Sequence, residues 1–364
     1  EYSERDAKAE TALCGIDLYA STIALCPATW TATPATMLYQ LTVGPYKGSA
    51  QKFEESLCSR GEQAVGYTAG GPYRLDHGLV SAECNDSFAA AALLYYHFSR
   101  YFDTHIRVPV AVQRTMDNDA HRQRVTQRGV DLTSQGDPLL HSAWRELHQA
   151  QSETAPSNSS GARLTVEQGQ ISGALLQPVG KRCGVLVNGI AAQQGAPGDY
   201  AALSQTPALV ALQNTQPLRE AIAAGVEQAQ QPQFSEAGAD EISDRQMAYW
   251  MQDLSEILLL DYIFSQQRRI GNIDCLDYWY WKRGRNIRKQ LARTRTPPKN
   301  MARHKPLRIQ DTVISNNSSS GLSSSRNLTR EAGMLQKLAH FNPDTYKRLI
   351  RLDRDFSRQD ELYR

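Results

Sequence analysis

The 364-residue sequence lacks the patterns that mark several common classes of protein. No run approaches about 18 consecutive apolar residues, and the longest apolar segments, at 88–96 and 257–260, are too short to cross a bilayer, so we expect no membrane span. It has no Gly-x-Ser-x-Gly elbow of a serine hydrolase and no His-Glu-x-x-His zinc motif. Its 41% hydrophobic residues exclude a wholly disordered chain and predict a hydrophobic core.

The chain also has almost no net charge, because 40 Lys and Arg face 38 Asp and Glu. This balance hides a basic segment at 268–308, which holds 13 Lys and Arg and only two acids, Asp274 and Asp277. The segment carries +11 and leaves −9 for the rest of the chain. It predicts either a solvated loop or a surface for an anionic partner such as nucleic acid.

Cysteine is scarce, and none of the six cysteines forms a Cys-x-x-Cys pair of the kind that binds zinc or exchanges disulfides. Four of them, Cys14, Cys26, Cys58 and Cys84, lie near the beginning of the chain. This clustering favours disulfides in a periplasmic or secreted protein. Small buried thiols in a cytoplasmic protein are the alternative, and the spacing does not fix any pairing.

Hydrophobic periodicity along the chain predicts an α+β fold. Residues 1–85 are expected to form short strands and turns without a long helix, and a buried helix at 87–102 leads into a Val-Pro strand at 106–112. Further elements are expected as a strand at 171–179, a helix that begins after Ser243 and ends near Ser265, strands at 275–281 and 307–314, a basic loop between those two strands, and helices at 328–341 and 343–356.

The order of elements in the second half is typical of phosphotransferases, in which a long helix, a polar turn, two strands and a second polar turn follow one another. The first turn, at 266–274, contains Arg269, Gly271 and Asn272, and the helix at 87–102 ends just before a Val-Pro strand. In these features the sequence resembles the divergent branch of the kinase-like superfamily, which holds phosphatidylinositol 3- and 4-kinases, HipA-type toxin kinases and secretory-pathway kinases.

This resemblance implies a two-lobed protein-kinase-like fold. Residues 1–178 would form a β-rich N-lobe with one core helix, and residues 179–364 a mainly helical C-lobe. ATP would bind in the cleft between the lobes, near Gln177, together with Mg²⁺ or Mn²⁺. The substrate is unknown, because nothing in the sequence indicates whether it is a protein, a lipid, a sugar or another small molecule.

The resemblance also implies roles for individual residues. Arg74 stands where the family places a phosphate-binding Lys, and Glu83 stands where an acidic partner is expected, so both are predicted nucleotide-binding residues. Asn272 and Asn316 are the predicted metal contacts. Arg269 is expected to structure the turn that carries the catalytic group.

Three positions depart from what the family's chemistry needs. Arg268 occupies the position of the catalytic Asp, and a guanidinium group has no lone pair with which to accept a substrate proton. Asn316 replaces a metal-binding Asp, although Mg²⁺ prefers carboxylate and phosphate oxygens. Arg74 in place of Lys changes the geometry of the phosphate contact. Asp274 is the nearest carboxylate that could compensate, and Asp277 and Asp311 are others.

Three functions therefore remain open from the sequence. The chain could be a kinase-like phosphotransferase that works through Arg268, Arg269 and Asp274, or a pseudokinase that binds nucleotide without turnover. The third alternative is an anion- or nucleic-acid-binding protein that uses the basic segment at 268–308. The substitutions at the catalytic and metal positions favour the pseudokinase.

Overall fold

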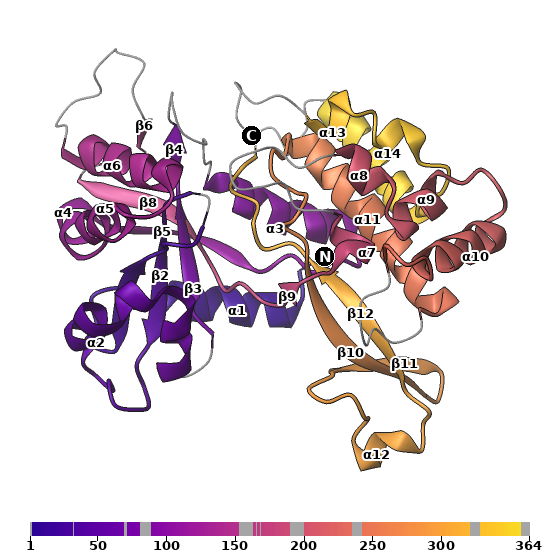
Figure 1. Ribbon diagram of the computed structural model, residues 1–364, viewed down its shortest axis with the longest axis horizontal. Helices are drawn as coiled ribbons and strands as arrows, with labels where there is room; N and C mark the ends of the chain where they lie inside the picture. Colours follow the sequence, from indigo (N-terminus) through magenta and orange to yellow (C-terminus); the bar gives the residue numbers. More distant parts are fainter. Residues whose placement is uncertain are drawn as a thin grey trace.

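A computed structural model describes most of the chain and shows a mixed α+β protein (Figure 1). The described residues are 2–31, 33–68, 71–80, 89–152, 163–164, 166–167, 169–189, 200–234, 242–320 and 328–357. Within them, an N-terminal part is built on one antiparallel sheet, and a C-terminal part contains helices and a second antiparallel sheet. Residues 177–180 connect the two parts. The expected α+β class is confirmed.

The first sheet, sheet A, has the strand order β1-β2-β3-β8-β5, with β7 paired to β8. Its strands are β1 (Ile23–Pro27), β2 (Ala35–Gln40), β3 (Tyr73–His77), β5 (Ala111–Asp117), β7 (Val166–Glu167) and β8 (Gln170–Leu176). Because β3 lies between β2 and β8, its residues after Tyr73 are buried in the middle of the sheet. A small separate pair joins β4 (Leu79–Val80) to β6 (Arg163–Leu164).

Several helices surround sheet A, so the expectation of an N-lobe with one core helix is wrong. They are α1 (Glu4–Cys14), α2 (Ala50–Leu57), α3 (Ala90–Phe102), α4 (Asn118–His121), α5 (Gln127–Thr133) and α6 (Pro138–Ser152), with a 3₁₀ segment η1 (Cys58–Tyr67) and a π-helical turn η2 (Arg122–Thr126). Helix α1 is largely polar and depends on local capping, because Ser3 and Asp6 cap each other's backbone amides. Long-range contacts also hold it, since Asp6 pairs with Arg100 of α3.

The C-terminal part begins with short helices and continues through the second sheet, whose order is β11-β10-β12 with β9 paired to β10. Its elements are β9 (Lys181–Arg182), α7 (Val185–Asn188), α8 (Tyr200–Ser204), α9 (Pro207–Gln213), α10 (Leu218–Ala229), α11 (Asp244–Phe264), β10 (Asp274–Arg283), β11 (Asn286–Leu291), α12 (Lys299–Ala302), β12 (Leu307–Val313), α13 (Leu328–Glu331), η3 (Leu335–Lys337) and α14 (Pro343–Ser357). None of the described helices is long and apolar enough to cross a membrane.

Helix α11 is the central helix of the C-terminal part and confirms the predicted bounds. The Ser243 side chain accepts a hydrogen bond from the Gln246 backbone amide at its beginning, and Ser265 ends it in a left-handed conformation. Its apolar residues share one hydrophobic core with those of α3. Helix α3 therefore links the N-terminal chain segment to the C-terminal core.

We expect Ser243→Ala to lower the free energy of unfolding by about 1 kcal/mol, because the amide of Gln246 loses its acceptor. Urea unfolding would measure this loss. Ser49→Ala is the matched control, since Ser49 precedes α2 without making a side-chain capping bond. An equal loss in both variants would contradict a specific capping role for Ser243.

Several predictions about elements differ from the structure. Residues 1–85, expected to lack a long helix, contain the 11-residue helix α1. Residues 286–291, expected as loop, form strand β11, whose residues are all exposed and so give no hydrophobic pattern. The strand expected at 106–112 begins only at Ala111, because Arg107 makes an isolated bridge to Val313 instead of joining sheet A. The helix expected at 328–341 is divided into α13 and η3.

Two disulfides join cysteines that are distant in sequence. Cys26–Cys58 ties β1 to the segment after α2, and Cys183–Cys275 ties the end of β9 to β10. Cys14 is an exposed free thiol, and Cys84 lies outside the described residues. Disulfides persist mainly in oxidising compartments. The periplasmic or secreted location favoured by the sequence stays a prediction.

Candidate functional site

The predicted turn at 266–274 follows the end of α11 and is held by a buried ion pair. Arg269 is 1% exposed. Its Nε donates to Oδ2 of Asp261 and its Nη2 donates to Oδ1, each at 2.9 Å. The Tyr95 hydroxyl donates to the same carboxylate at 2.7 Å. Burial disfavours the charged form of the Arg269 guanidinium, but the attraction of the Asp261 carboxylate is stronger than this effect. The net result is a raised pKa of Arg269. Arg269 therefore structures the turn and is out of reach of a substrate.

The same turn is joined to the second predicted turn, which follows β12. Arg269 Nη2 donates to Oδ1 of Asn317 at 2.8 Å, and the Gln267 amide donates to the Ser319 carbonyl at 3.0 Å. The carbonyl of Asn316 lies 3.5 Å from both Arg269 Nη1 and the Gln266 side-chain amide. The two polar turns, predicted separately from the sequence, lie against each other.

Arg74 reaches these turns from the centre of sheet A. Its guanidinium forms a buried two-point ion pair with Asp76, with Nε and Nη2 at 2.8 and 2.9 Å from the two carboxylate oxygens. Nη2 also donates to the Ser315 carbonyl at 2.6 Å, across 241 positions of sequence. Arg74 thus fastens strand β3 to the segment that follows β12. Two of its nitrogens are committed to protein partners.

Asp274, the first residue of β10, is the acid nearest to this arrangement. Its Oδ1 lies 3.3 Å from Nη1 of Arg182, which is half exposed on β9. Burial raises the pKa of the Asp274 carboxyl above its usual value. The guanidinium groups of Arg182, Arg269 and Arg74 oppose this rise, so all three lie within electrostatic range of one carboxylate.

We call these five residues, Arg74, Asp76, Arg182, Arg269 and Asp274, the junction cluster. Strand β9 is held in place by pairing with β10 and by the disulfide between Cys183 and Cys275. That covalent link fixes the position of Arg182 beside Asp274. The cluster therefore has a buried frame and an exposed basic edge formed by Arg182, with the exposed Lys181 beside it.

The other predicted site residues have the following positions. Arg268 is half-buried, and this burial lowers the pKa of its guanidinium. The carboxylate of Asp137, which precedes α6, acts in the opposite direction, so Arg268 lies near the N-terminal part. Asn272 donates from its side chain to the Arg268 carbonyl at 2.7 Å. Asn316 contacts the turn through its backbone carbonyl. Glu83 lies outside the described residues.

These residues offer a poor fit to a divalent cation. Asn272 uses its amide nitrogen on the Arg268 carbonyl, which leaves one neutral oxygen, and Asp274 is already paired with Arg182. Mg²⁺ and Mn²⁺ favour oxygen ligands with negative charge. Among the described residues no group of three His, Cys, Asp or Glu could hold a metal ion.

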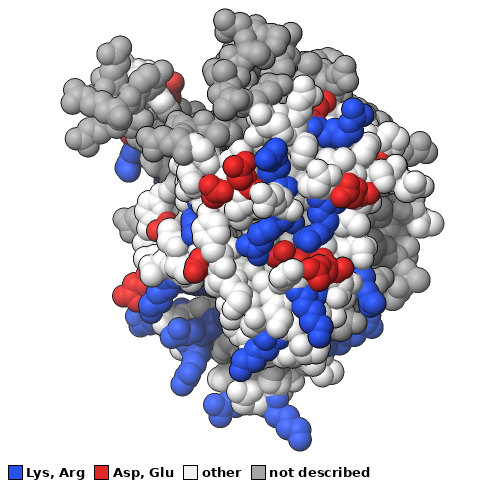
Figure 2. Space-filling model, turned by 90° about the vertical axis from the view of Figure 1, so that its left-hand side faces the viewer, with Lys and Arg blue, Asp and Glu red and all other residues white. Residues whose placement is uncertain are grey.

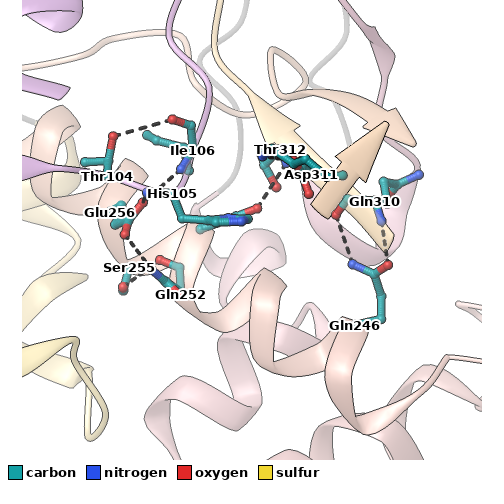
Figure 3. Close-up of polar contacts among 12 residues, drawn as sticks. Thr104, His105, Ile106, Gln246, Gln252, Ser255, Glu256, Gln310, Asp311 and Thr312 are labelled. Carbon is teal, nitrogen blue, oxygen red and sulfur yellow. Dashed lines mark hydrogen bonds and ion pairs between the residues drawn. The ribbon is translucent and has the colours of Figure 1, made fainter. Parts of the chain in front are cut away.

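A second buried polar cluster lies at the root of the second sheet, around the segment that follows α3 (Figure 3). His105 Nδ1 lies 2.7 Å from Oδ1 of Asp253, whose Oδ2 accepts from the Thr312 amide at 3.0 Å. Glu256 Oε2 accepts from the backbone amides of His105 and Ile106 at 2.7 and 3.0 Å. Both carboxylates are fully buried. Because their oxygens bind backbone amides, the cluster fastens the 104–107 segment to α11.

Two acids named as compensating carboxylates point to other partners. Asp311 is fully buried and accepts from the Tyr280 hydroxyl at 2.8 Å and from Lys289 Nζ at 3.1 Å. Asp277 pairs with Arg308 at 2.7 Å. Both carboxylates therefore form contacts within the second sheet and do not belong to the junction cluster.

Sequence reasoning missed Asp76, Arg182, Asp253, Glu256 and Asp261. Acids on an otherwise apolar helix were the available signal for the last three, because a carboxylate on a buried face needs a partner. Nothing in the sequence indicates that β9 exists or that Arg182 faces Asp274.

No protein-family model matches the chain, and neither a curated protein nor a solved structure matches it.

Proposed function

We propose that the chain has a two-lobed kinase-like architecture, that it binds the phosphate groups of a nucleotide at the junction cluster, and that it transfers phosphoryl groups weakly or not at all. One observation carries the proposal. Arg74 from the centre of sheet A contacts Ser315 at the second polar turn, which itself lies against the turn at 266–274. Strand β3 and both turns are the three elements that a kinase-like nucleotide site requires.

The exposed edge of the junction cluster suits phosphate recognition. Arg182 has half of its side chain exposed and Lys181 is exposed beside it, while Arg268 is half-buried nearby in the turn. Guanidinium groups bind phosphate oxygens through paired hydrogen bonds. Arg74 supports this edge indirectly, because it positions Ser315 and lies in electrostatic range of Asp274.

Weak or absent turnover follows from the groups that are present. Arg268 cannot accept a proton from a substrate hydroxyl, and Arg269 is buried in its pair with Asp261. Asp274 is the carboxylate beside the exposed edge, and one of its oxygens is paired with Arg182. Phosphoryl transfer depends on charge stabilisation by metal ions and on a positioned acceptor for the nucleophile's proton, and these residues supply neither function well.

Thermal unfolding with ATP in Mg²⁺, in Mn²⁺ and in EDTA tests the proposal. A ligand that binds only the folded state adds about 2.7 kcal/mol at 100 times its dissociation constant, so we expect ATP to raise the melting temperature in EDTA as well as in metal. Arg182→Ala should reduce the ATP-dependent shift, because Arg182 belongs to the exposed edge.

Arg219→Ala is the matched control, since Arg219 is an exposed residue of α10 and is far from the cluster in sequence. It should leave the ATP-dependent shift unchanged. The absence of any shift with millimolar ATP would overturn nucleotide binding. A shift that appears only with Mg²⁺ or Mn²⁺ would instead overturn the metal-independent form of the proposal.

A further inference from the structure

The hairpin of β10 and β11, with α12 and the beginning of β12, forms a basic arm at residues 278–310. These 33 residues contain 11 Lys and Arg and no Asp or Glu. The arm projects away from the helices of the C-terminal part (Figure 1). Two of its cations are paired at the root, because Lys289 contacts Asp311 and Arg308 contacts Asp277. The other nine have no acidic partner among the residues that the structure describes. They are Lys282, Arg283, Arg285, Arg288, Arg293, Arg295, Lys299, Arg303 and Lys305.

The charge of the basic arm is unlike that of the rest of the surface shown. Over the face formed by the N-terminal part, Lys and Arg lie interspersed with Asp and Glu (Figure 2). In the N-terminal part a partly exposed cation can have an acidic neighbour, as in the contact of Arg122 with Asp119. On the basic arm only Lys289 and Arg308 have an acidic partner among the described residues, so the excess positive charge favours a strongly anionic partner.

Exposed aliphatic side chains lie among the cations of the arm. Ile287 is 71% exposed, Leu307 is 42% exposed and Leu291 is 38% exposed. Cross-strand pairing places Ile287 opposite Lys282 and Leu291 opposite Tyr278, so these residues lie on one face of the hairpin. The same face carries Lys289, which is opposite Tyr280.

We propose that the basic arm binds the surface of an anionic lipid membrane. Its Lys and Arg would contact lipid phosphates, and Ile287 at the tip would enter the interface between headgroups and acyl chains. Nucleic acid fits the arm less well, because single strands are bound by stacking on exposed aromatic side chains. Tyr278 and Trp279 are buried at the root, Tyr280 and Trp281 are only half-buried, and the exposed large apolar residues of the arm are the aliphatic Ile287, Leu291 and Leu307.

Co-sedimentation with vesicles tests this proposal. One set is phosphatidylcholine alone, and the other contains phosphatidylglycerol as about one third of the lipid, because anionic lipid supplies the surface charge. We expect binding to the anionic vesicles alone, with a loss of affinity as salt rises from about 0.05 to 0.5 M. Arg285→Glu/Arg288→Glu should weaken binding at least about tenfold.

Two further variants make the test specific. Lys52→Glu/Arg219→Glu makes the same charge change at exposed residues outside the arm and should leave vesicle binding nearly unchanged. Ile287→Ser should weaken vesicle binding several-fold, since the apolar insertion is lost, and should leave any binding of duplex DNA unchanged. Equal melting temperatures of all variants without ligand would confirm that each is folded.

The proposal is independent of nucleotide binding, since Arg285→Glu/Arg288→Glu should keep the ATP-dependent thermal shift. The membrane proposal is overturned if the protein does not bind anionic vesicles, or if Arg285→Glu/Arg288→Glu and the Lys52→Glu/Arg219→Glu control bind them equally. Tight binding to duplex DNA combined with no vesicle binding would assign the arm to nucleic acid instead.

Discussion

Replacing Arg269 by methionine is expected to lower the free energy of unfolding by about 3 to 5 kcal/mol. The change leaves the fully buried Asp261 carboxylate without its guanidinium partner, and an unpaired charge is costly in a buried position. Asp261→Leu should cost a similar amount, because it leaves the buried guanidinium of Arg269 unpaired. Urea or guanidinium unfolding would measure both losses.

The double variant Asp261→Leu/Arg269→Met should lose less stability than the sum of the two single variants, because neither charge is then left alone. Lys347→Met is the control for removing a cation from an exposed pair on α14, and it should leave stability nearly unchanged. Single variants at Asp261 and Arg269 that lose less than about 1 kcal/mol would contradict the buried pair.

Acidification is expected to destabilise sheet A through a buried histidine pair. The Thr36 hydroxyl lies 2.8 Å from Nε2 of both His77 and His121, whose rings are 4.6 Å apart. Burial lowers the pKa of His77 from 6.5 to about 4, and burial also lowers the pKa of His121. Because the folded state resists protonation, His77 contributes stability that is complete above pH 6.5. About 3 kcal/mol of it is lost as the pH falls to about 4.

Unfolding of wild type and His77→Gln at pH 7, 5.5 and 4.5 tests this expectation. The stability difference between the two proteins should shrink as the pH falls, because only the wild type has this histidine to protonate. His304→Gln, at a half-exposed position, is the control and should show no such change. A difference that is constant with pH would contradict the prediction.

The effect of His77 must be measured as a difference from a variant, because Glu256 changes the stability in the opposite direction as the pH falls. Burial and the neighbouring Asp253 raise the pKa of Glu256 from 4.5 to about 7. A raised pKa means that the folded state holds the proton more tightly, so this stability is complete below pH 4.5 and is lost as the pH rises through about 7. The wild-type pH profile contains both effects, so the difference between wild type and His77→Gln is the quantity to compare.

The elements with strong local signals could be predicted from the sequence. Helix α11 has a Ser cap and regularly spaced apolar residues. Strand β10 is rich in aromatic residues, and β12 alternates between apolar and polar residues. The predicted bounds of these three elements therefore agree closely with the structure. Strand β11 gave no signal because every residue on it is exposed. Helix α1 was missed because its stability comes from capping and from contacts with α3 instead of an apolar stripe.

The candidate site could be predicted only in part. The two polar turns and Arg74 were identified from the order of elements, and the structure brings them together. Their partners Asp76, on the same strand as Arg74, and Asp261, near the end of α11, were not assigned, because the sequence does not show that these side chains are buried. The roles of Arg268, Asn272 and Asn316 stay predictions.

The central proposal is that the junction cluster recognises the phosphates of a nucleotide without needing a metal. Isothermal titration of the protein with ATP and with adenosine, both in EDTA, tests it most directly. We predict that ATP binds and that adenosine, which lacks phosphates, binds at least about tenfold more weakly, since charged hydrogen bonds to phosphate are lost. Equal affinity for the two ligands, or no binding of ATP at millimolar concentration, would contradict the proposal.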